Sequence, residues 1–247
     1  MRYTLIIPAF NEEALLPSTL ASVRSAMQAC SHPGELVVVD NNSTDDTAAV
    51  ARAGGARVVF EAHNQISRAR NAGAMASHGE ALIFLDADTQ LPAELLQGAL
   101  DRLASDTCCG GGASVVFDQP SAMAQRGVRL WGQISRRFRL AAGSFVFCLR
   151  EGFEAVGGFS ESVYAGEEIW LSRALGRWGK ARGMSFEVLT HAPVVTSARK
   201  LEWHSQAYIL GYTFLVVLFP FMTRYRALCG PWYQRPSRTK QSTDERK

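Results

Sequence analysis

The sequence lacks the short glycine-rich motifs that most often identify a nucleotide-binding protein. No Gly-x-Gly-x-x-Gly follows the first apolar segment, and no glycine-rich loop ends in Gly-Lys-Ser or Gly-Lys-Thr. These motifs hold the phosphates of a nucleotide on backbone N–H groups where a helix begins. Without them, the dinucleotide-binding and P-loop interpretations lose their main support.

Cysteine is also scarce, and its arrangement argues against a disulfide framework. The 247-residue chain has 5 cysteines, and no two of them have Cys-x-x-Cys spacing. An odd number of cysteines is not typical of a full set of paired bridges. Because Met1-Arg2-Tyr3 leads directly into an apolar segment without the features of a signal peptide, we expect reduced thiols, mostly in the core, and a cytoplasmic location.

No apolar run is long enough to predict a membrane-spanning helix. The longest, residues 208–222, has 15 residues and contains Gly211 and Pro220, whereas a spanning helix needs roughly 20. We expect an amphipathic-to-apolar helix over residues 201–222, followed by arginines and aromatic residues of the kind found at membrane interfaces. Two alternatives stay open: residues 208–226 make peripheral contact with the inner face of a membrane, or the helix packs on the protein or in a dimer interface.

Over most of the chain, basic and acidic residues nearly balance. The net charge is +3, and the segment from Arg224 onward alone holds seven basic and two acidic residues. The preceding residues therefore carry a small negative net charge. A nucleic-acid-binding domain needs a basic patch or stripe, so we expect no nucleic acid partner.

The sequence does contain a regular alternation of short apolar segments and helical patterns. Strands are predicted at residues 4–7, 35–39, 57–60 and 82–85, and helices at 17–29, from Ser43 to Gly55, at 67–77 and at 92–103. Ser43 with Asp46 resembles a capping box at the start of the second helix. This alternation predicts an α/β fold with a mostly parallel sheet flanked by helices.

The second half of the chain is less regular. It predicts strands at residues 110–117, 144–149 and 185–189, and helices at 121–140, 150–156 and 167–178. We expect one domain over residues 1–200, a C-terminal helical extension over residues 201–236, and a disordered tail over residues 237–247.

Acidic residues follow three of the predicted strands. Asp86 and Asp88 come directly after residues 82–85, while Glu12 and Asp40 follow the first two strands. If the extended geometry persists, Asp86 and Asp88 point in the same direction and can hold a divalent cation such as Mg²⁺. Since consecutive ends of parallel strands form one crevice, these acids predict a ligand bound through a metal and through hydrogen bonds. The alternative is that each acid caps a helix.

Two predicted helices carry further candidates. Glu167 and Glu168 open one helix, where a carboxylate could act as a general base on an alcohol or only interact with the helix dipole. Gly73 lies inside another helix, at a cost of roughly 1 kcal/mol relative to alanine, which predicts the close approach of a backbone or a ligand. Arg68 could meet a phosphate or be solvated.

Several segments occur in the order found in one enzyme family. They are Pro8-Ala9-Phe10-Asn11-Glu12, Asp40-Asn41-Asn42-Ser43-Thr44-Asp45, Arg68 with Asn71-Ala72-Gly73, Asp86-Ala87-Asp88, Gly157-Gly158-Phe159 and Gly166-Glu167-Glu168. Together they resemble family 2 glycosyltransferases of the GT-A fold over about residues 3–200. The resemblance implies the inverting transfer of a sugar from a nucleotide-sugar donor, with uridine as the expected base, to a hydroxyl acceptor that is either free or lipid-linked.

The resemblance also implies a role for each matching position. On the donor side, the nucleotide-sugar residues would be Pro8, Ala9, Phe10, Glu12, Asp40, Arg68, Asp86 and Ala87, with Asp88 and Asp86 at the divalent cation, Mn²⁺ or Mg²⁺. On the acceptor side, Gly143, Gly158, Phe159 and Trp170 would border the acceptor. Glu168 would be the catalytic base, with Glu167 beside it.

Three departures from the family pattern bear on function. The acidic pair is Glu167-Glu168 instead of Glu-Asp, and Trp170 stands where an acid is common. Trp170 could stack on an acceptor or simply pack. The Gln-x-x-Arg-Trp signature of processive synthases is absent, which predicts the transfer of a single sugar. His191 could be a metal ligand or structural.

Two other functions are weighed against this one. A sugar nucleotidyltransferase would favour a glycine-rich loop with basic residues after the first strand, and Pro8-Ala9-Phe10-Asn11 is unlike it. A non-catalytic nucleotide-sugar-binding protein of the same fold is indicated only by glutamate in place of aspartate at residue 168.

Overall fold

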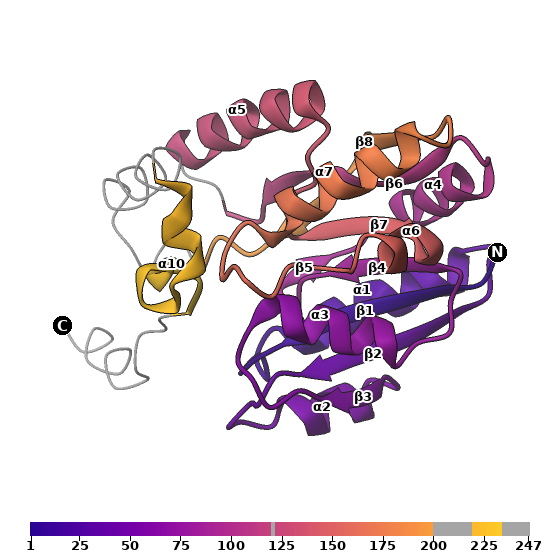
Figure 1. Ribbon diagram of the computed structural model, residues 1–247. Coiled ribbons are helices and arrows are strands. Elements are labelled where there is room, and N and C mark those ends of the chain that lie inside the picture. The colour runs from indigo at the N-terminus through magenta and orange to yellow at the C-terminus, as the bar shows by residue number, and fades with distance from the viewer. Residues whose placement is uncertain (120–121, 200–218, 234–247) are drawn as a thin grey trace.

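The computed structural model describes residues 1–119, 122–199 and 219–233, and within them eight strands form one sheet (Figure 1). The strand order is β3-β2-β1-β4-β7-β6-β8-β5. The strands are β1 (Tyr3–Ala9), β2 (Gly34–Asp40), β3 (Arg57–Phe60), β4 (Ala81–Leu85), β5 (Thr89–Gln90), β6 (Cys108–Phe117), β7 (Phe145–Leu149) and β8 (Ser185–Thr196).

Helices cover both faces of this sheet. They are α1 (Leu16–Ala29), α2 (Thr47–Ala53), α3 (Ile66–Met75), α4 (Ala93–Ala104), α5 (Ala122–Phe138), α6 (Arg150–Ala155) and α7 (Glu167–Lys180). The C-terminal described segment contains the short helices η1 (Pro220–Arg224), η2 (Arg226–Leu228) and α10 (Gly230–Tyr233).

Alternate residues of the strands enter two separate hydrophobic cores. In β1, Leu5 and Ile7 pack with α1 and α4, whereas Ile6 between them packs with α3 and α7. The same alternation separates Ile83 from Phe84 in β4. Because side chains alternate across a strand, an uninterrupted apolar run is the pattern of a strand that is buried on both faces.

The first half of the sheet is parallel. β1 pairs in parallel with β2 and β4, and β2 pairs in parallel with β3. β7 then runs antiparallel to β4 and to β6, while β6 and β8 are parallel. The predicted α/β fold with a mostly parallel sheet is confirmed, and the carboxyl ends of β1, β2 and β4 lie at one edge.

Most element boundaries lie within about two residues of the prediction, and three differences bear on the fold or the site. β1 continues through Pro8, although proline has no backbone N–H. The pairing of β1 with β4 ends at Ile6, so no hydrogen bond to β4 is lost at Pro8. The predicted capping box is wrong: α2 begins at Thr47, and the Ser43 hydroxyl instead accepts a hydrogen bond from the Asn11 N–H at 3.0 Å. β8 extends to Thr196, well beyond its predicted end at residue 189.

The C-terminal prediction is tested only in part. Residues 200–218 and 234–247 lie outside the described residues, so most of the predicted helix 201–222 and the predicted disordered tail lie outside them too. Residues 220–224, which are described, form the 3₁₀ helix η1 instead of the end of an α-helix. In the parts of the chain that the structure covers, no helix has the length and apolar character needed to cross a membrane.

Candidate active site

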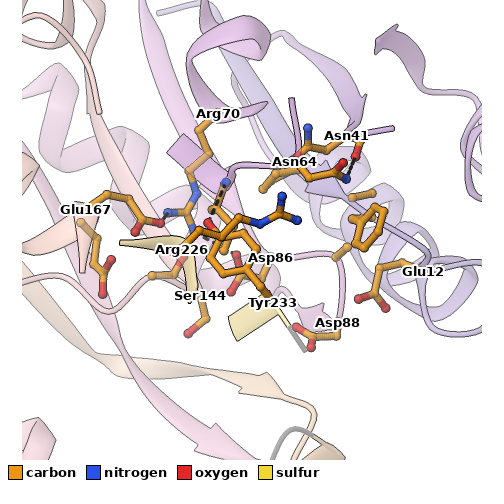
Figure 2. Close-up of a pocket in the computed structure, with 17 residues that line it drawn as sticks. Glu12, Asn41, Asn64, Arg70, Asp86, Asp88, Ser144, Glu167, Arg226 and Tyr233 are labelled. Atoms are coloured by element: carbon orange, nitrogen blue, oxygen red, sulfur yellow. Dashed lines mark hydrogen bonds and ion pairs between the residues drawn. The ribbon is translucent and has the colours of Figure 1, made fainter. Parts of the chain in front are cut away.

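A cavity of about 270 Å³ opens at the edge where β1 and β4 end and α7 begins. Figure 2 shows Arg70 and Glu167 at one side of it, Glu12 and Asp88 at the other, and Arg226 and Tyr233 near its centre. The lining residues are Pro8, Ala9, Phe10, Glu12, Asn41, Asn64, Ile66, Arg70, Asp86, Ala87, Asp88, Gly143, Ser144, Glu167, Glu168, Arg226 and Tyr233. Its position at the carboxyl ends of parallel strands is where open α/β sheets bind ligands.

The loops after β1 and β2 are fixed to each other on one side of the cavity. The Asn11 carboxamide oxygen accepts a hydrogen bond from the Thr44 N–H at 2.8 Å, and the Glu12 N–H donates to the Thr47 hydroxyl at 2.8 Å. Asn11 has a positive φ of 52°, which asparagine tolerates better than most residues. This bracing holds the backbone from Pro8 to Glu12 as a preformed wall.

The two aspartates after β4 lie in a turn. The Thr89 N–H donates to the Asp86 carbonyl at 3.2 Å, and extended geometry ends at Leu85. The expectation that Asp86 and Asp88 project together along a continuing strand is therefore wrong. The turn directs them to different partners: Asp86 pairs with Arg70, and Asp88 lies 3.8 Å from Arg199.

Arg70 on α3 connects three elements beneath the cavity. Its guanidinium donates to Asp86 Oδ1 at 2.9 Å, to Glu167 Oε1 at 2.8 Å and to the Gly143 carbonyl at 2.8 Å. The side chain is only 2% exposed. Burial opposes its charge, but the nearby carboxylates, led by Asp86 and Glu167, raise the pKa of Arg70 above its ordinary value.

Among the residues that the structure describes, Glu168 makes no direct ion pair, although the Arg70 guanidinium acts on it electrostatically. Arg70 bonds to the neighbouring Glu167, and a Cβ built on Gly143 would lie 3.6 Å from the Glu168 carboxyl carbon. Burial, and then the adjacent Glu167 carboxylate, raise the pKa of Glu168 to about 8. A carboxylate whose pKa lies near the working pH is suited to accept a proton as a general base.

Glu12 and Asp88 form a second acidic group, at the other side of the cavity. Arg199 Nη2 lies 2.9 Å from both oxygens of Glu12 and 3.8 Å from Asp88 Oδ2. A guanidinium between these two carboxylates indicates that the position attracts a cation, and carboxylate oxygens are the ligands that Mg²⁺ prefers. Asp88 therefore fits a divalent cation better than Asp86, which is bound to Arg70.

The protein would supply only part of such a coordination shell. Within residues 1–119, 122–199 and 219–233, no group of three or more His, Cys, Asp or Glu side chains could hold a metal ion. Mg²⁺ commonly takes one or two carboxylates and completes its shell with substrate phosphates and water. The residues present fit a cation that is shared with a diphosphate.

Ten of the residues predicted for the site line the cavity. They are Pro8, Ala9, Phe10, Glu12, Asp86, Ala87, Asp88, Gly143, Glu167 and Glu168. The structure brings these positions together from four elements that are distant in the sequence, and it leaves their chemical roles as predictions.

Five other predicted residues lie outside the lining. Asp40 is buried at the end of β2 and accepts a hydrogen bond from the Ser43 N–H at 3.0 Å, whereas Arg68 pairs with Glu161 at 3.0 Å. Phe159 is 1% exposed and packs edge-on against Phe84, and Gly158 precedes it with a positive φ of 71°. Trp170 is 49% exposed on α7.

His191 lies away from the cavity. It is part of β8, and its Nε2 is 3.3 Å from the carbonyl oxygen of Glu94 on α4. Of the two alternatives for this histidine, the geometry supports the structural one.

Sequence reasoning missed Asn41, Asn64, Ile66, Arg70, Arg226 and Tyr233 as lining residues. The helical period of α3 could have identified Arg70, because it shares a buried face with Ser67 and Ala74. No sequence pattern indicates Tyr233, whose hydroxyl oxygen accepts from the Ile66 N–H at 3.5 Å and whose ring contacts Tyr164. Its position follows from tertiary contacts alone.

Comparison with known proteins identifies relatives in sequence. The family model described as "Glycosyl transferase family 2" matches residues 4–149. An uncharacterized glycosyltransferase of Mycobacterium tuberculosis is 38% identical over 103 residues, which are 42% of each chain. An undecaprenyl-phosphate 4-deoxy-4-formamido-L-arabinose transferase of Pseudomonas paraeruginosa is 32% identical over 108 residues, 41% of this chain and 32% of that protein. The match thus spans less than half the length of these curated relatives.

Solved structures share the fold over most of the chain. A mannosyltransferase from Pyrobaculum calidifontis, in complex with GDP-Man and Mn²⁺, has a TM-score of 0.64 and 22% identity, covering 90% of this chain and 62% of that one. Glucosyl-3-phosphoglycerate synthase from Mycobacterium tuberculosis, with Mn²⁺, UDP and glucosyl-3-phosphoglycerate, has a TM-score of 0.63 and 19% identity, covering 90% and 79%. At such identities, these two structures establish the GT-A fold.

Proposed function

Because the chain belongs to glycosyl transferase family 2, we propose that it transfers one sugar, with inversion, from a nucleotide-diphosphate sugar to an acceptor hydroxyl. The observation that supports this most strongly is that one cavity holds both Asp88 and Glu12, which share Arg199, and Glu168, which follows the Arg70-bound Glu167. The first group suits a diphosphate with a cation, and the second suits the removal of a proton.

On the donor side, the braced segment from Pro8 to Glu12 forms the wall against which the nucleoside would lie. We propose that Asp88, with Glu12 near it, holds Mn²⁺ or Mg²⁺. That cation would stabilise the negative charge on the departing diphosphate. Asp86 is oriented by Arg70 and would accept hydrogen bonds from the sugar part of the donor.

On the acceptor side, Glu168 would take the proton of the attacking hydroxyl. Its raised pKa gives the carboxylate the basicity that this transfer needs. A Cβ at residue 143 would lie 3.6 Å from the Glu168 carboxyl carbon, so glycine at this position leaves room for an acceptor atom beside the carboxyl. Attack on the anomeric carbon opposite the diphosphate inverts the configuration.

We propose uridine as the donor base and a lipid-linked molecule as one candidate acceptor. A relative named undecaprenyl-phosphate 4-deoxy-4-formamido-L-arabinose transferase supports a lipid-linked acceptor, and a structural neighbour solved with UDP supports uridine. The cysteines in the described residues are free, and Cys108, Cys109, Cys148 and Cys229 are buried, which supports a reducing, cytoplasmic location.

The first test is thermal melting against UDP, GDP, CDP and TDP, each with and without Mn²⁺. A ligand at about 100 times its dissociation constant stabilises the native state by roughly 2.7 kcal/mol, a rise in Tm of a few degrees. We expect a metal-dependent rise with UDP that Asp88→Ala abolishes. The matched control is Asp101→Ala on α4, where the side chain is 59% exposed. A rise that survives Asp88→Ala would contradict the assigned cation site.

A second test separates catalysis from binding alone. We expect Glu168→Gln to bind the donor with unchanged affinity and to lose transfer by about 10²- to 10⁴-fold, the usual contribution of a general base. Transfer at the wild-type rate would remove Glu168 from the mechanism. Donor binding without transfer to any tested acceptor in the wild-type protein would favour the non-catalytic alternative.

A further inference from the structure

Helix α5 is strongly amphipathic and carries charge of one sign. Residues 122–140 contain Arg126, Arg129, Arg136, Arg137 and Arg139 and no acidic residue. At 100° per residue, the first four of these arginines fall on one side of the helix. Leu130, Ile134 and Phe138, spaced by four residues, fall on an adjacent apolar side.

The rest of the protein covers only part of this apolar side. Val128, Trp131 and Ser135 of α5 face Val115 and Val188 of the sheet across a cavity of about 300 Å³. Leu130 is 59% exposed and Phe138 is 64% exposed in the described structure. Leu130 and Phe138, at the two ends of the stripe, are therefore available to a partner, while Ile134 between them is half-buried.

A basic groove continues this surface onto α7. It has a volume of about 890 Å³ and is lined by Phe138 and Arg139 from the end of α5 and by Arg173, Arg177 and Lys180 from α7. These three α7 side chains are exposed, and none of them makes an ion pair with another described residue. Residues 169–186 contain no acid. Glu187, the next one, is bound by Arg102.

We propose that this α5–α7 surface docks the protein on a membrane rich in anionic phospholipid. The basic groove is complementary in charge to such a surface, and each basic residue near it contributes about 1 kcal/mol of attraction. The adjacent apolar stripe has the composition of a helix that lies in the interface plane. A nucleic acid would satisfy the arginines but would leave Leu130 and Phe138 exposed to water.

This surface is separate from the proposed reaction. None of its residues lines the cavity that holds Asp88 and Glu168. Figure 1 shows α5 at the end of the molecule opposite α2. Membrane docking can therefore be tested on the full chain by binding alone, whatever the donor and acceptor prove to be.

The test is co-sedimentation of the full-length protein with two kinds of vesicle, phosphatidylcholine alone and phosphatidylcholine with about 40% phosphatidylglycerol, which gives the second kind a negative surface potential. We expect binding to the anionic vesicles only, weakened by salt. The double variant Arg173→Glu/Lys180→Glu should lower the affinity at least tenfold. The control, Arg24→Glu/Arg52→Glu, makes the same change in net charge on exposed residues of α1 and α2 and should bind like the wild type.

Three outcomes would overturn the proposal. Equal loss in both double variants would mean that net charge, and not this surface, decides binding. Tighter binding to single-stranded oligonucleotides than to anionic vesicles would make nucleic acid the partner. The third concerns the double variant Leu130→Ser/Phe138→Ser, which we expect to weaken vesicle binding at an unchanged Tm. A lowered Tm with unchanged vesicle binding would instead mean that the stripe is covered by the chain's own apolar residues 208–218.

Discussion

The guanidinium of Arg70 lies 2.9 Å from the carboxylate of Asp86, in a position where almost no solvent reaches it. The same group bonds Glu167 and the Gly143 carbonyl. One arginine from α3 thus fixes the end of β4, the start of α7 and the loop before β7 in a single arrangement.

Replacing Arg70 should destabilise the whole protein. Arg70→Met leaves the buried Glu167 carboxylate without its partner, and removing one member of a buried ion pair costs about 3–5 kcal/mol. Arg68→Met, two residues away, removes an exposed pair with Glu161 and should cost at most about 1 kcal/mol. Urea unfolding of both variants measures the difference. Similar stabilities would show that the Arg70 network is not a stability determinant.

Glu168 makes stability depend on pH. Its pKa of about 8 in the folded protein lies above its ordinary value of 4.5, so the folded state holds the proton more tightly than the unfolded state. The stability that this provides is complete below pH 4.5 and is lost as the pH rises toward 8. The Tm of Glu168→Gln, relative to wild type, should therefore rise by a few degrees between pH 5 and pH 9. A constant difference would contradict the raised pKa.

The same group should shape the pH profile of transfer. If Glu168 is the base, kcat/KM at saturating cation increases with pH and levels off above about 8. At pH 7 the reactive carboxylate is about a tenth of the total. Glu168→Gln should give a low and flat profile. A wild-type profile that is already level at pH 6 would assign the base to another group.

Two glycines in helices should respond to alanine in opposite ways. A Cβ on Gly73 would lie 2.4 Å from Ile6 Cγ2 and 2.9 Å from Val39 Cγ2, so Gly73→Ala should cost about 1–3 kcal/mol through overpacking. A Cβ on Gly127 in α5 meets nothing within 4 Å, and Gly127→Ala should stabilise by up to about 1 kcal/mol. Thermal melting of the pair tests this, and a stable Gly73→Ala would refute the close packing of α3 on the sheet.

Local patterns explain why much of the fold could be predicted. The apolar run Leu5-Ile6-Ile7 is readable as a strand because both faces of the sheet are buried, and periodicity reports burial directly. Gly73 does allow close approach, but of the Ile6 and Val39 side chains in β1 and β2, and not of the backbone or ligand that the sequence predicted.

The site could be predicted less completely. Its details depend on the direction in which each side chain points and on contacts between residues that are far apart in the sequence. Arg68 and Arg70 are the same residue type two positions apart. Only the face of α3 on which each one lies decides that Arg70, and not Arg68, lines the cavity. Asp86 and Asp88 both line the cavity, but a turn that the sequence does not mark replaces the continuing strand and directs them to different arginines. Tyr233 reaches the cavity through contacts with Ile66 and Tyr164, which no local pattern encodes.

The contribution of Arg226 and Tyr233 to the cavity has a practical consequence for recombinant expression. The family model ends at residue 149 and the predicted catalytic domain at residue 200, yet the Arg226 guanidinium lies over the Tyr233 ring, 5.4 Å from its centre, and both line the cavity. A recombinant fragment cut at either boundary would lack one wall of the cavity. An affinity tag is therefore better attached at the amino terminus than fused close behind residue 233.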